Sequence, residues 1–272
     1  MSAAVRVVTD SNTMVPASLA AEVDLVVVPL TVTIGGDELV ENGTLDVAAA
    51  YGRLRRGEPA TTSAPAPGAF AAAYAACGDG PIVSVHIGAA YSGTINAAQL
   101  GATVGGADVR IVDSGTASFL AGCCALAAAE TACAGGDVDA VVAAAEHVAA
   151  EVASVFTIAE LDRAAAGGRL GRHDEQADGT PVLHMSAAGI VPLAAVHSAD
   201  EAADVMLAHL ASVEGPLRIG VGDADAGPVV DDLEARVRAT CGGAEVIRYV
   251  VGPSVAAHAG MGTFGVVYHR RR

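Results

Sequence analysis

The sequence contains no lysine and no tryptophan, and only 3% of its residues are aromatic. The absence of lysine excludes a lysine Schiff base and a lysine-bound phosphate from its chemistry. With so few aromatic residues, the hydrophobic cores must be built from Ala, Val, Leu and Ile, within an apolar content of 52%. Only 17% of the residues are charged, and this composition is typical of a folded chain.

Positive charge is also scarce. All 15 basic residues are arginines, the acidic residues number 31, and the formal net charge is −16. An acidic surface repels phosphate groups, so we expect no nucleic-acid partner. The longest largely apolar run, residues 117–129, is too short to span a bilayer, and Asp10 interrupts any signal-type apolar segment. The five cysteines form no C-x-x-C motif, so we expect free thiols in a cytoplasmic protein without stable membrane insertion.

The first half of the chain alternates strands with helices. The pattern predicts strands at 5–8, 82–87 and 109–112, and one at 23–32 that is interrupted at Pro29. It predicts helices at 47–55, 69–76, 92–101, 116–133 and 138–151. This alternation predicts a parallel sheet with helices on both faces. The stretch 59–68 contains three prolines and is predicted to be a loop.

The pattern changes after residue 152. Two strands around a turn are predicted within 182–196, a helix with a capping box from Ser198 to Glu201 follows, and further strands are predicted at 217–221, 246–251 and 263–267. A short helix is predicted at 160–165. At roughly 150 residues per domain, the chain is long enough for two domains. We expect one at 1–152 and a mixed-sheet domain at 153–272.

Polar residues follow three predicted strands, at Thr9-Asp10-Ser11, Ser92-Gly93-Thr94 and Asp113-Ser114. Because the carboxyl ends of parallel strands share one edge of a sheet, where ligands bind, we expect these residues to converge. Thr61-Thr62-Ser63 adds hydroxyl groups from the proline-rich stretch. The alternative is that each group caps a helix, and the residues alone leave both interpretations open.

Catalytic and metal-binding patterns are weak. His258 lies in the glycine-rich stretch 258–265, where the glycines permit either close approach of a ligand or a tight turn. Neither Ser63 nor Ser92 lies in a G-x-S-x-G motif or beside a base in the sequence, which gives nucleophilic catalysis little support. The segment His173-Asp174-Glu175 has no partners at helical spacing and indicates a polar loop rather than a metal site.

Several stretches, taken in order, resemble the DegV family. They are VTDSNTMVP near the start, VVVPLTV at 26–32, TSAP at 62–65, YSGTINAA at 91–98, IVDS at 111–114, GGRLG at 167–171, VLHMSAAGIVPLAAV at 182–196 and HAGMG at 258–262. The resemblance implies a two-domain α/β protein. Its N-terminal domain would be a three-layer α/β/α structure with a parallel sheet, and its C-terminal domain a mixed α/β sheet. It also implies one bound long-chain fatty acid in the cleft between the domains, and no cofactor.

The resemblance further implies which residues bind the ligand: Thr62, Ser63, Ser92, Gly93, Thr94, Arg169 and His258. It implies a partner, the bacterial fatty acid kinase, which phosphorylates the bound acid to an acyl phosphate for phospholipid synthesis. The chain departs from the family at three positions. Thr180 stands where a Lys is usual, His197 where an Arg is frequent, and Met261 where a Pro is common. The first two departures remove positive charge.

We therefore expect a monomeric, non-enzymatic carrier that presents a fatty acid to a kinase. Two alternatives stay open. The first is an acyl hydrolase that uses Ser92 and His258, which turnover of an acyl ester would reveal. The second is a regulatory protein that binds a small metabolite, which extraction of the bound ligand would reveal.

Overall fold

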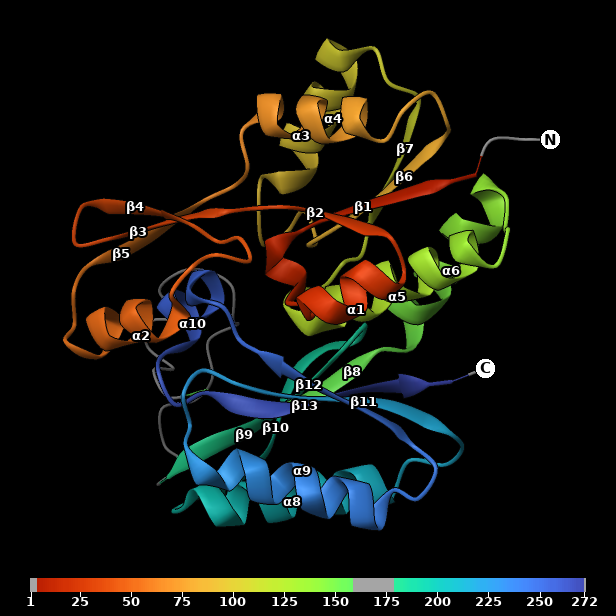
Figure 1. Cartoon of the computed structure of the whole chain (residues 1–272). Helices are drawn as coiled ribbons and strands as arrows, with labels where there is room; N and C mark the ends of the chain where they lie inside the picture. The colour runs from red at the N-terminus through yellow and green to blue at the C-terminus, as the bar shows by residue number, and fades with distance from the viewer. Residues whose placement is uncertain (1–3, 159–178, 272) are drawn as a thin grey trace. The chain divides into compact units, whose positions relative to one another are not determined.

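The computed structural model describes residues 4–158 and 179–271, and the chain divides into two compact units (Figure 1). Unit 1 comprises Met1–Asp46 and Glu58–Ala150, and unit 2 comprises Val47–Gly57 and Glu151–Arg272. Helix α2 (Val47–Arg55) therefore departs from the expected 1–152 domain and belongs to unit 2, where it packs against α10 (Pro253–Ala259). The predicted helix at 160–165 and Arg169 lie outside the described residues.

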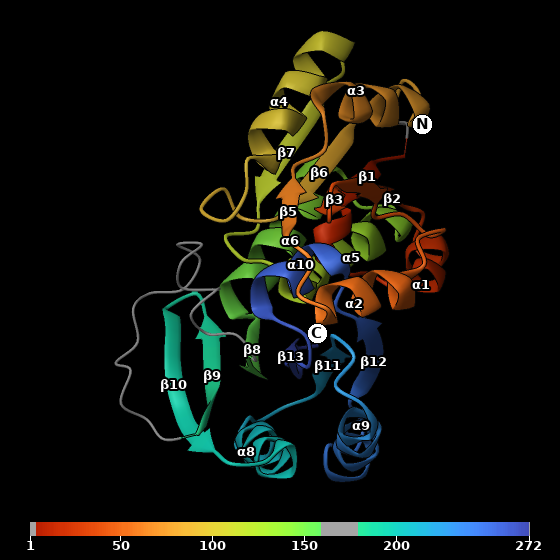
Figure 2. The same cartoon turned by 90° about the vertical axis from the view of Figure 1, so that its left-hand side faces the viewer.

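Unit 1 is built around a four-stranded parallel sheet, sheet A, in the order β2-β1-β6-β7. Its strands are β1 (Arg6–Asp10), β2 (Leu25–Val28), β6 (Ile82–His86) and β7 (Val109–Asp113). Helices α3 (Pro67–Ala76) and α4 (Thr94–Gly105) pack on one face, and α5 (Phe119–Cys133) packs on the other (Figure 2). Helices α1 (Ala17–Glu22) and α6 (Val138–Glu151) complete the regular helices of this unit. The predicted three-layer architecture is confirmed.

Small residues let the helices of unit 1 lie close to their neighbours. A Cβ atom on Gly101 of α4 would lie 2.5 Å from the Cβ of Phe70 on α3, and one on Gly122 of α5 would lie 2.3 Å from the carbonyl oxygen of Thr13. Phe70 and Tyr74 pack into the core on the α3 side of the sheet. Close helix packing thus replaces large aromatic side chains in a chain that has few of them.

A small antiparallel sheet in unit 1 corrects the prediction that 59–68 is a loop. Its strands, in the order β4-β3-β5, are β3 (Thr31–Ile34), β4 (Asp37–Val40) and β5 (Ala60–Ser63). The prolines do not disturb the ladder, because Pro59 precedes β5, Pro65 follows it, and Pro67 begins α3, where no N–H is needed. The predicted strand at 23–32 is divided at Pro29 into β2 and β3.

Unit 2 contains the six-stranded sheet C, in the order β10-β9-β8-β13-β11-β12. Its strands are β8 (Ala153–Thr157), β9 (Thr180–Ser186), β10 (Gly189–Val196), β11 (Leu217–Asp223), β12 (Glu245–Val250) and β13 (Phe264–Arg270). Among the described strands of this sheet, only the β11–β12 pair is parallel, so the predicted mixed sheet is confirmed. Helices α8 (Ala199–Ala211) and α9 (Pro228–Thr240) pack on one face and bury the core of unit 2.

The start of α8 confirms the predicted N-cap. The Ser198 hydroxyl accepts the N–H of Glu201 at 3.2 Å, and the Glu201 carboxylate accepts the N–H of His197 at 2.8 Å. The reciprocal bond thus reaches the residue before the cap instead of the cap itself. Within residues 4–158 and 179–271, no helix has the length and apolarity needed to cross a membrane.

Candidate ligand-binding site

The loops at the carboxyl edge of sheet A contact one another, as the sequence predicts. The Asp10 carboxylate at the end of β1 accepts the N–H of Ile87, which follows β6, at 3.3 Å. The N–H of Ala89 donates to the Asp113 carboxylate at the end of β7, also at 3.3 Å. Loops that follow three strands therefore meet at one edge of the sheet, and this edge is the candidate site.

Several polar groups at this edge have structural partners. The Ser11 hydroxyl donates to the Glu41 carboxylate and accepts the N–H of Leu30, both at 2.9 Å. Asp113 also accepts the N–H of Gly115 at 2.8 Å. These bonds satisfy loop backbone, so the structural interpretation accounts for Ser11 and Asp113.

Ser92 and Thr94 form a hydroxyl pair at the start of α4. Their hydroxyl oxygens lie 2.8 Å apart, and the Ser92 oxygen also accepts the N–H of Thr94 at 3.3 Å. The helix begins at Thr94 with Gly93 as N-cap, two residues later than predicted. Two hydroxyls carry two protons, and the bond between them uses one. Thr94 is fully buried and Ser92 is half-buried, so the remaining proton can reach a ligand from Ser92, beside a helix N-terminus that favours negative charge.

The glycine between the two hydroxyls is not required by the fold. Gly93 has ordinary dihedral angles (φ −74°, ψ 7°), and a Cβ atom there would have no heavy atom within 4 Å. Gly88 is the opposite case, because its Cβ would lie 2.8 Å from the carbonyl carbon of Gly115. Gly88 is therefore explained by loop packing, whereas Gly93 leaves open space beside the Ser92 hydroxyl, in which a ligand group can approach the backbone.

Thr62 and Ser63 lie on β5 of the small sheet. Ser63 pairs with Thr31, and the residue before Thr31, Leu30, donates its N–H to the Ser11 hydroxyl. Since Ser11 follows β1, these contacts tie the end of β5 to the same edge of sheet A. Ser63 is exposed and Thr62 is half-buried.

The Thr116 hydroxyl, which the sequence did not single out, also lies at this edge. The backbone oxygen of Thr116 accepts the N–H of Gly88 at 2.7 Å, and the oxygen of Gly88 accepts the N–H of Ser92 at 3.3 Å. The side-chain oxygen of Thr116 is buried and has no hydrogen-bond partner among the described residues. An unsatisfied buried hydroxyl costs about 1–3 kcal/mol, so a ligand that bonds to it would relieve a real penalty.

His258 lies on α10 in unit 2 and is half-buried. The glycines that follow it are explained by the fold. Gly260 and Gly262 have positive φ values of 90° and 86°, and a Cβ on Gly265 would lie 2.5 Å from the Cβ of Phe156. Turn geometry therefore accounts for Gly260 and Gly262, and strand packing accounts for Gly265. The role of His258 itself stays a prediction.

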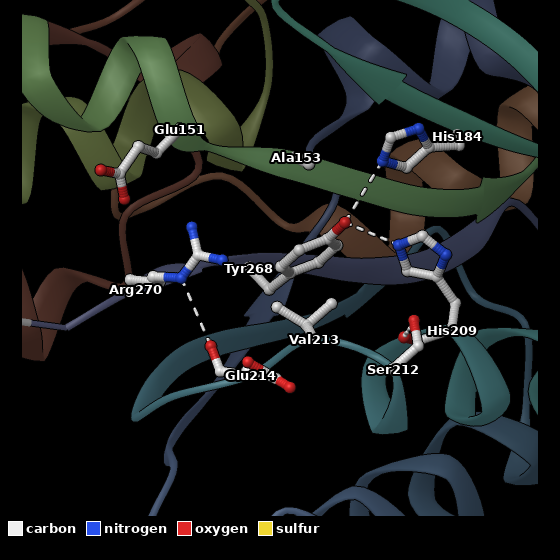
Figure 3. Close-up of a pocket in the computed structure, with 9 residues that line it drawn as sticks. All are labelled: Glu151, Ala153, His184, His209, Ser212, Val213, Glu214, Tyr268 and Arg270. Carbon is white, nitrogen blue, oxygen red and sulfur yellow. Dashed lines mark hydrogen bonds between the residues drawn. The ribbon is translucent and has the colours of Figure 1, made fainter.

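Unit 2 also holds a pocket of about 480 Å³ (Figure 3). It is lined by Glu151, Ala153, His184, His209, Ser212, Val213, Glu214, Tyr268 and Arg270. The Tyr268 hydroxyl lies 2.6 Å from Nε2 of His209 and 3.2 Å from Nε2 of His184. Burial lowers the pKa of both histidines, and the neighbouring His184 lowers the pKa of His209 further. With one phenolic proton, the hydroxyl can donate to one imidazole and accept from the other.

This pocket does not have the ligands of a metal site of the usual kind. The part of the chain that the structure describes contains no group of three or more His, Cys, Asp or Glu side chains placed to hold a metal ion. All five cysteines are free thiols, and burial raises the pKa of Cys124 to about 12, which disfavours the thiolate that binds metals.

Comparison with known proteins gives consistent results over the whole chain. A family model described as "Uncharacterised protein, DegV family" matches residues 4–271. A DegV domain-containing protein of Streptomyces coelicolor is 36% identical over 281 residues, which cover 100% of both chains. A solved structure described as "Fatty Acid Binding of a DegV family Protein from Thermus thermophilus" is 26% identical with a TM-score of 0.88, and the match covers 99% of this chain and 100% of that one. The structure of DegV from Bacillus subtilis is 24% identical with a TM-score of 0.87 over 99% and 100% of the two chains, which supports the fold.

Proposed function

The chain belongs to the DegV family, and on this premise we propose that it is a fatty-acid-binding protein. The relative from Thermus thermophilus, which matches nearly the whole chain, is described by its fatty acid binding. In our proposal the carboxylate of the acid is held at the carboxyl edge of sheet A, by the hydroxyl of Ser92 and the backbone at Gly93 and Thr94. Thr62 and Ser63 supply further hydroxyl donors.

The observation that carries this proposal is the Ser92–Thr94 hydroxyl pair, which has one proton more than the bond between them uses, beside the open side of Gly93. A buried carboxylate without donors is costly, and fixed donors at a helix N-terminus offset that cost. The acyl tail contributes through burial, at about 0.8 kcal/mol for each methylene removed from water. A polar head site in a chain with 52% apolar residues suits an acid with a long tail.

Denaturing extraction of the purified protein, followed by mass spectrometry, tests this proposal. We expect a long-chain fatty acid at about one molecule per chain. A chain that is purified without lipid and binds no added fatty acid would exclude fatty-acid binding. Recovery of a small polar metabolite instead would favour the regulatory alternative.

We further propose that the bound acid is the substrate of a fatty acid kinase, and that the chain itself performs no chemistry. The kinase would transfer the γ-phosphoryl group of ATP to a carboxylate oxygen of the bound acid, which yields ADP and an acyl phosphate. His258 is the proposed contact of the phosphoryl group, and Arg169, which lies outside the described residues, is a proposed ligand-binding residue. In unit 1 the Ser92 hydroxyl bonds to Thr94, an arrangement that suits binding a head group better than activating a nucleophile.

Kinase-dependent consumption of ATP tests this second step. With a fatty acid kinase supplied, the lipid-loaded chain should support turnover, and His258→Ala should retain its lipid but reduce the rate at least tenfold. Equal rates for the two proteins would assign His258 a structural role. Hydrolysis of an acyl ester by the chain alone would instead support the hydrolase alternative.

A further inference from the structure

A chain of four buried polar side chains runs through unit 1, on the α3 side of sheet A. The Asp10 carboxylate lies 2.8 Å from Nδ1 of His86, Nε2 of His86 lies 2.7 Å from the Ser84 hydroxyl, and that hydroxyl lies 3.0 Å from the hydroxyl of Tyr74. Asp10, Ser84 and His86 are fully buried, and Tyr74 is 1% exposed. The ring of Phe70 packs edge-on against His86, so an apolar side chain borders this hydrogen-bonded network.

One arrangement of protons satisfies every group. A carboxylate can only accept, so Nδ1 of His86 donates to Asp10. In a neutral imidazole Nε2 then accepts from the Ser84 hydroxyl, whose oxygen accepts from Tyr74. Burial raises the pKa of Tyr74 to about 12, although its hydrogen bond with Ser84 acts in the opposite direction, so the phenol keeps its proton for this bond. A fully satisfied buried network of this kind specifies one geometry.

The order of the atoms is that of a Ser-His-Asp hydrolase triad, but the surroundings are not. The nucleophile of a triad must reach a substrate carbonyl, whereas the Ser84 hydroxyl is fully buried and also bonded to Tyr74. The network therefore has a structural role, at the end that contacts the loops. That end is Asp10, where β1 meets the loops of the candidate site.

Asp10 binds the backbone of two loops at once. Its Oδ1 accepts the N–H of Asn12 at 3.0 Å, and its Oδ2 accepts the N–H of Ile87 at 3.3 Å. The side-chain oxygen of Asn12 in turn accepts the N–H of Ser118 in a third loop, at 2.8 Å. Ile87 begins the segment that leads through Gly88 to the Ser92 hydroxyl.

We propose that Asp10, oriented by His86, is the positioning residue of the head-group site, because it fixes the 87–93 segment that carries Ser92. This inference rests on the proposed fatty-acid binding. It makes Asp10 and His86 act on the ligand through the backbone of that segment, without touching the ligand.

The test compares three variants of the full chain by hydrogen exchange and by fatty-acid binding. Asp10→Asn replaces one acceptor oxygen by an amide donor and should break a loop bond. Tyr74→Phe is the matched control, because it removes a hydroxyl from the same buried chain and leaves the Asp10–His86 bond in place. His86→Gln keeps the carboxylate and removes the imidazole that orients it. All three variants should lower the thermal midpoint of unfolding, so a loss of stability alone does not identify the positioning residue.

We expect Asp10→Asn to accelerate exchange in peptides covering 87–93 at least tenfold, relative to peptides of β11, and to weaken palmitate binding at least tenfold. Tyr74→Phe should change neither quantity more than twofold, and His86→Gln should lie between them. Equal loop exchange in Asp10→Asn and Tyr74→Phe would overturn the inference. If Asp10→Asn does not fold, the other two variants are compared instead. Exchange in 87–93 should then be faster in His86→Gln than in Tyr74→Phe, and equal exchange would overturn the inference.

The exchange measurement also separates this inference from the proposed function. If the wild-type chain binds no fatty acid, fatty-acid binding fails, but exchange in 87–93 still reports whether Asp10 fixes the segment. If palmitate binding is lost in Asp10→Asn while exchange in 87–93 is unchanged, Asp10 does not act through the segment, and the positioning role is wrong.

Discussion

Replacing Ser92 with alanine should weaken the binding of a fatty acid more than the binding of its methyl ester. In the wild type, the Ser92 oxygen accepts the N–H of Thr94 and lies 2.8 Å from the Thr94 hydroxyl. When the Thr94 hydroxyl donates this bond, the Ser92 proton is left for the ligand. Ser92→Ala removes that donor. The Thr94 hydroxyl cannot replace it, because Thr94 is fully buried. The variant therefore loses the contribution of the Ser92–Thr94 hydroxyl pair to the head group.

The size of the loss depends on the charge of the acceptor. A hydrogen bond to a carboxylate contributes about 1.5–3 kcal/mol, so the affinity for the acid should fall about 10- to 150-fold. A bond to the neutral carbonyl of the ester contributes about 0.5–1.5 kcal/mol, so its affinity should fall only about 2- to 12-fold. Thr94→Val should cost less than Ser92→Ala for the acid, because it leaves the Ser92 proton available.

Displacement of a fluorescent fatty acid by palmitate and by methyl palmitate measures both affinities on the same protein. Chemical denaturation is the control, since Ser92→Ala should lower the free energy of unfolding by only about 0.5–1.5 kcal/mol. Equal losses for acid and ester would refute the reasoning, because a residue that only supports the helix start does not distinguish a charged ligand from a neutral one.

Four other variants test the same edge and the pocket of unit 2. Gly93→Ala should reduce palmitate affinity about fivefold or more, while the free energy of unfolding changes by less than about 1 kcal/mol. Gly88→Ala should instead lower the free energy of unfolding by about 1–3 kcal/mol. A larger loss of stability in Gly93→Ala than in Gly88→Ala would contradict this assignment. Thr116→Val should stabilise the lipid-free protein by about 1 kcal/mol and weaken palmitate binding, and unchanged affinity would show that the hydroxyl does not contact ligand. Burial lowers the pKa of His184 and His209 in the fold, so their contribution to stability is complete above the unfolded pKa of about 6.5 and is lost as the pH falls below it. Replacing both with Gln should therefore reduce the fall in denaturation midpoint between pH 7 and pH 5. An unchanged fall would exclude these histidines as its source.

The layers of both units could be predicted because burial determines their sequence. A strand covered on both faces is buried along its length and largely apolar, and in β6, whose five residues are all buried, Ile82, Val83 and Val85 follow this rule. The N-cap at Ser198 was also predictable, because a cap is a local bond between residues three apart. These features depend on neighbours in the sequence or on a single buried layer.

The errors concern features that depend on distant parts of the chain. The strand β5 has an alternating burial pattern in a short edge of a small sheet, and its Thr-Thr-Ser composition does not distinguish it from a loop. Helix α2 was predicted correctly, yet its sequence does not show that it packs with α10, more than 190 residues later. Which core a helix joins is decided by tertiary contacts, which periodicity does not encode.

The sequence predicts some residues of the candidate site and not the buried network behind it. Ser92, Gly93 and Thr94 are conspicuous because hydroxyls interrupt an apolar sequence after a strand. The buried network was missed because Ser84 and His86 lie inside a strand that was treated as apolar. A signal for them exists, since two polar residues two apart in a buried strand point to the same face and need a buried partner.

The structure gives a physical criterion for separating supporting residues from ligand-binding ones at this edge. Asp10, Asp113 and Gly88 are each explained by a backbone contact that the loops need. Gly93 and Thr116 are not explained in this way, because a Cβ at 93 would have no heavy atom within 4 Å and the hydroxyl at 116 has no hydrogen-bond partner among the described residues. A folded chain tolerates an unused glycine and an unsatisfied hydroxyl at a cost in stability, and such local inconsistencies concentrate at functional sites. Gly93 adjoins Ser92, and the backbone of Thr116 is connected to that of Ser92 through Gly88, so this edge of sheet A is where a bound carboxylate would account for the sequence.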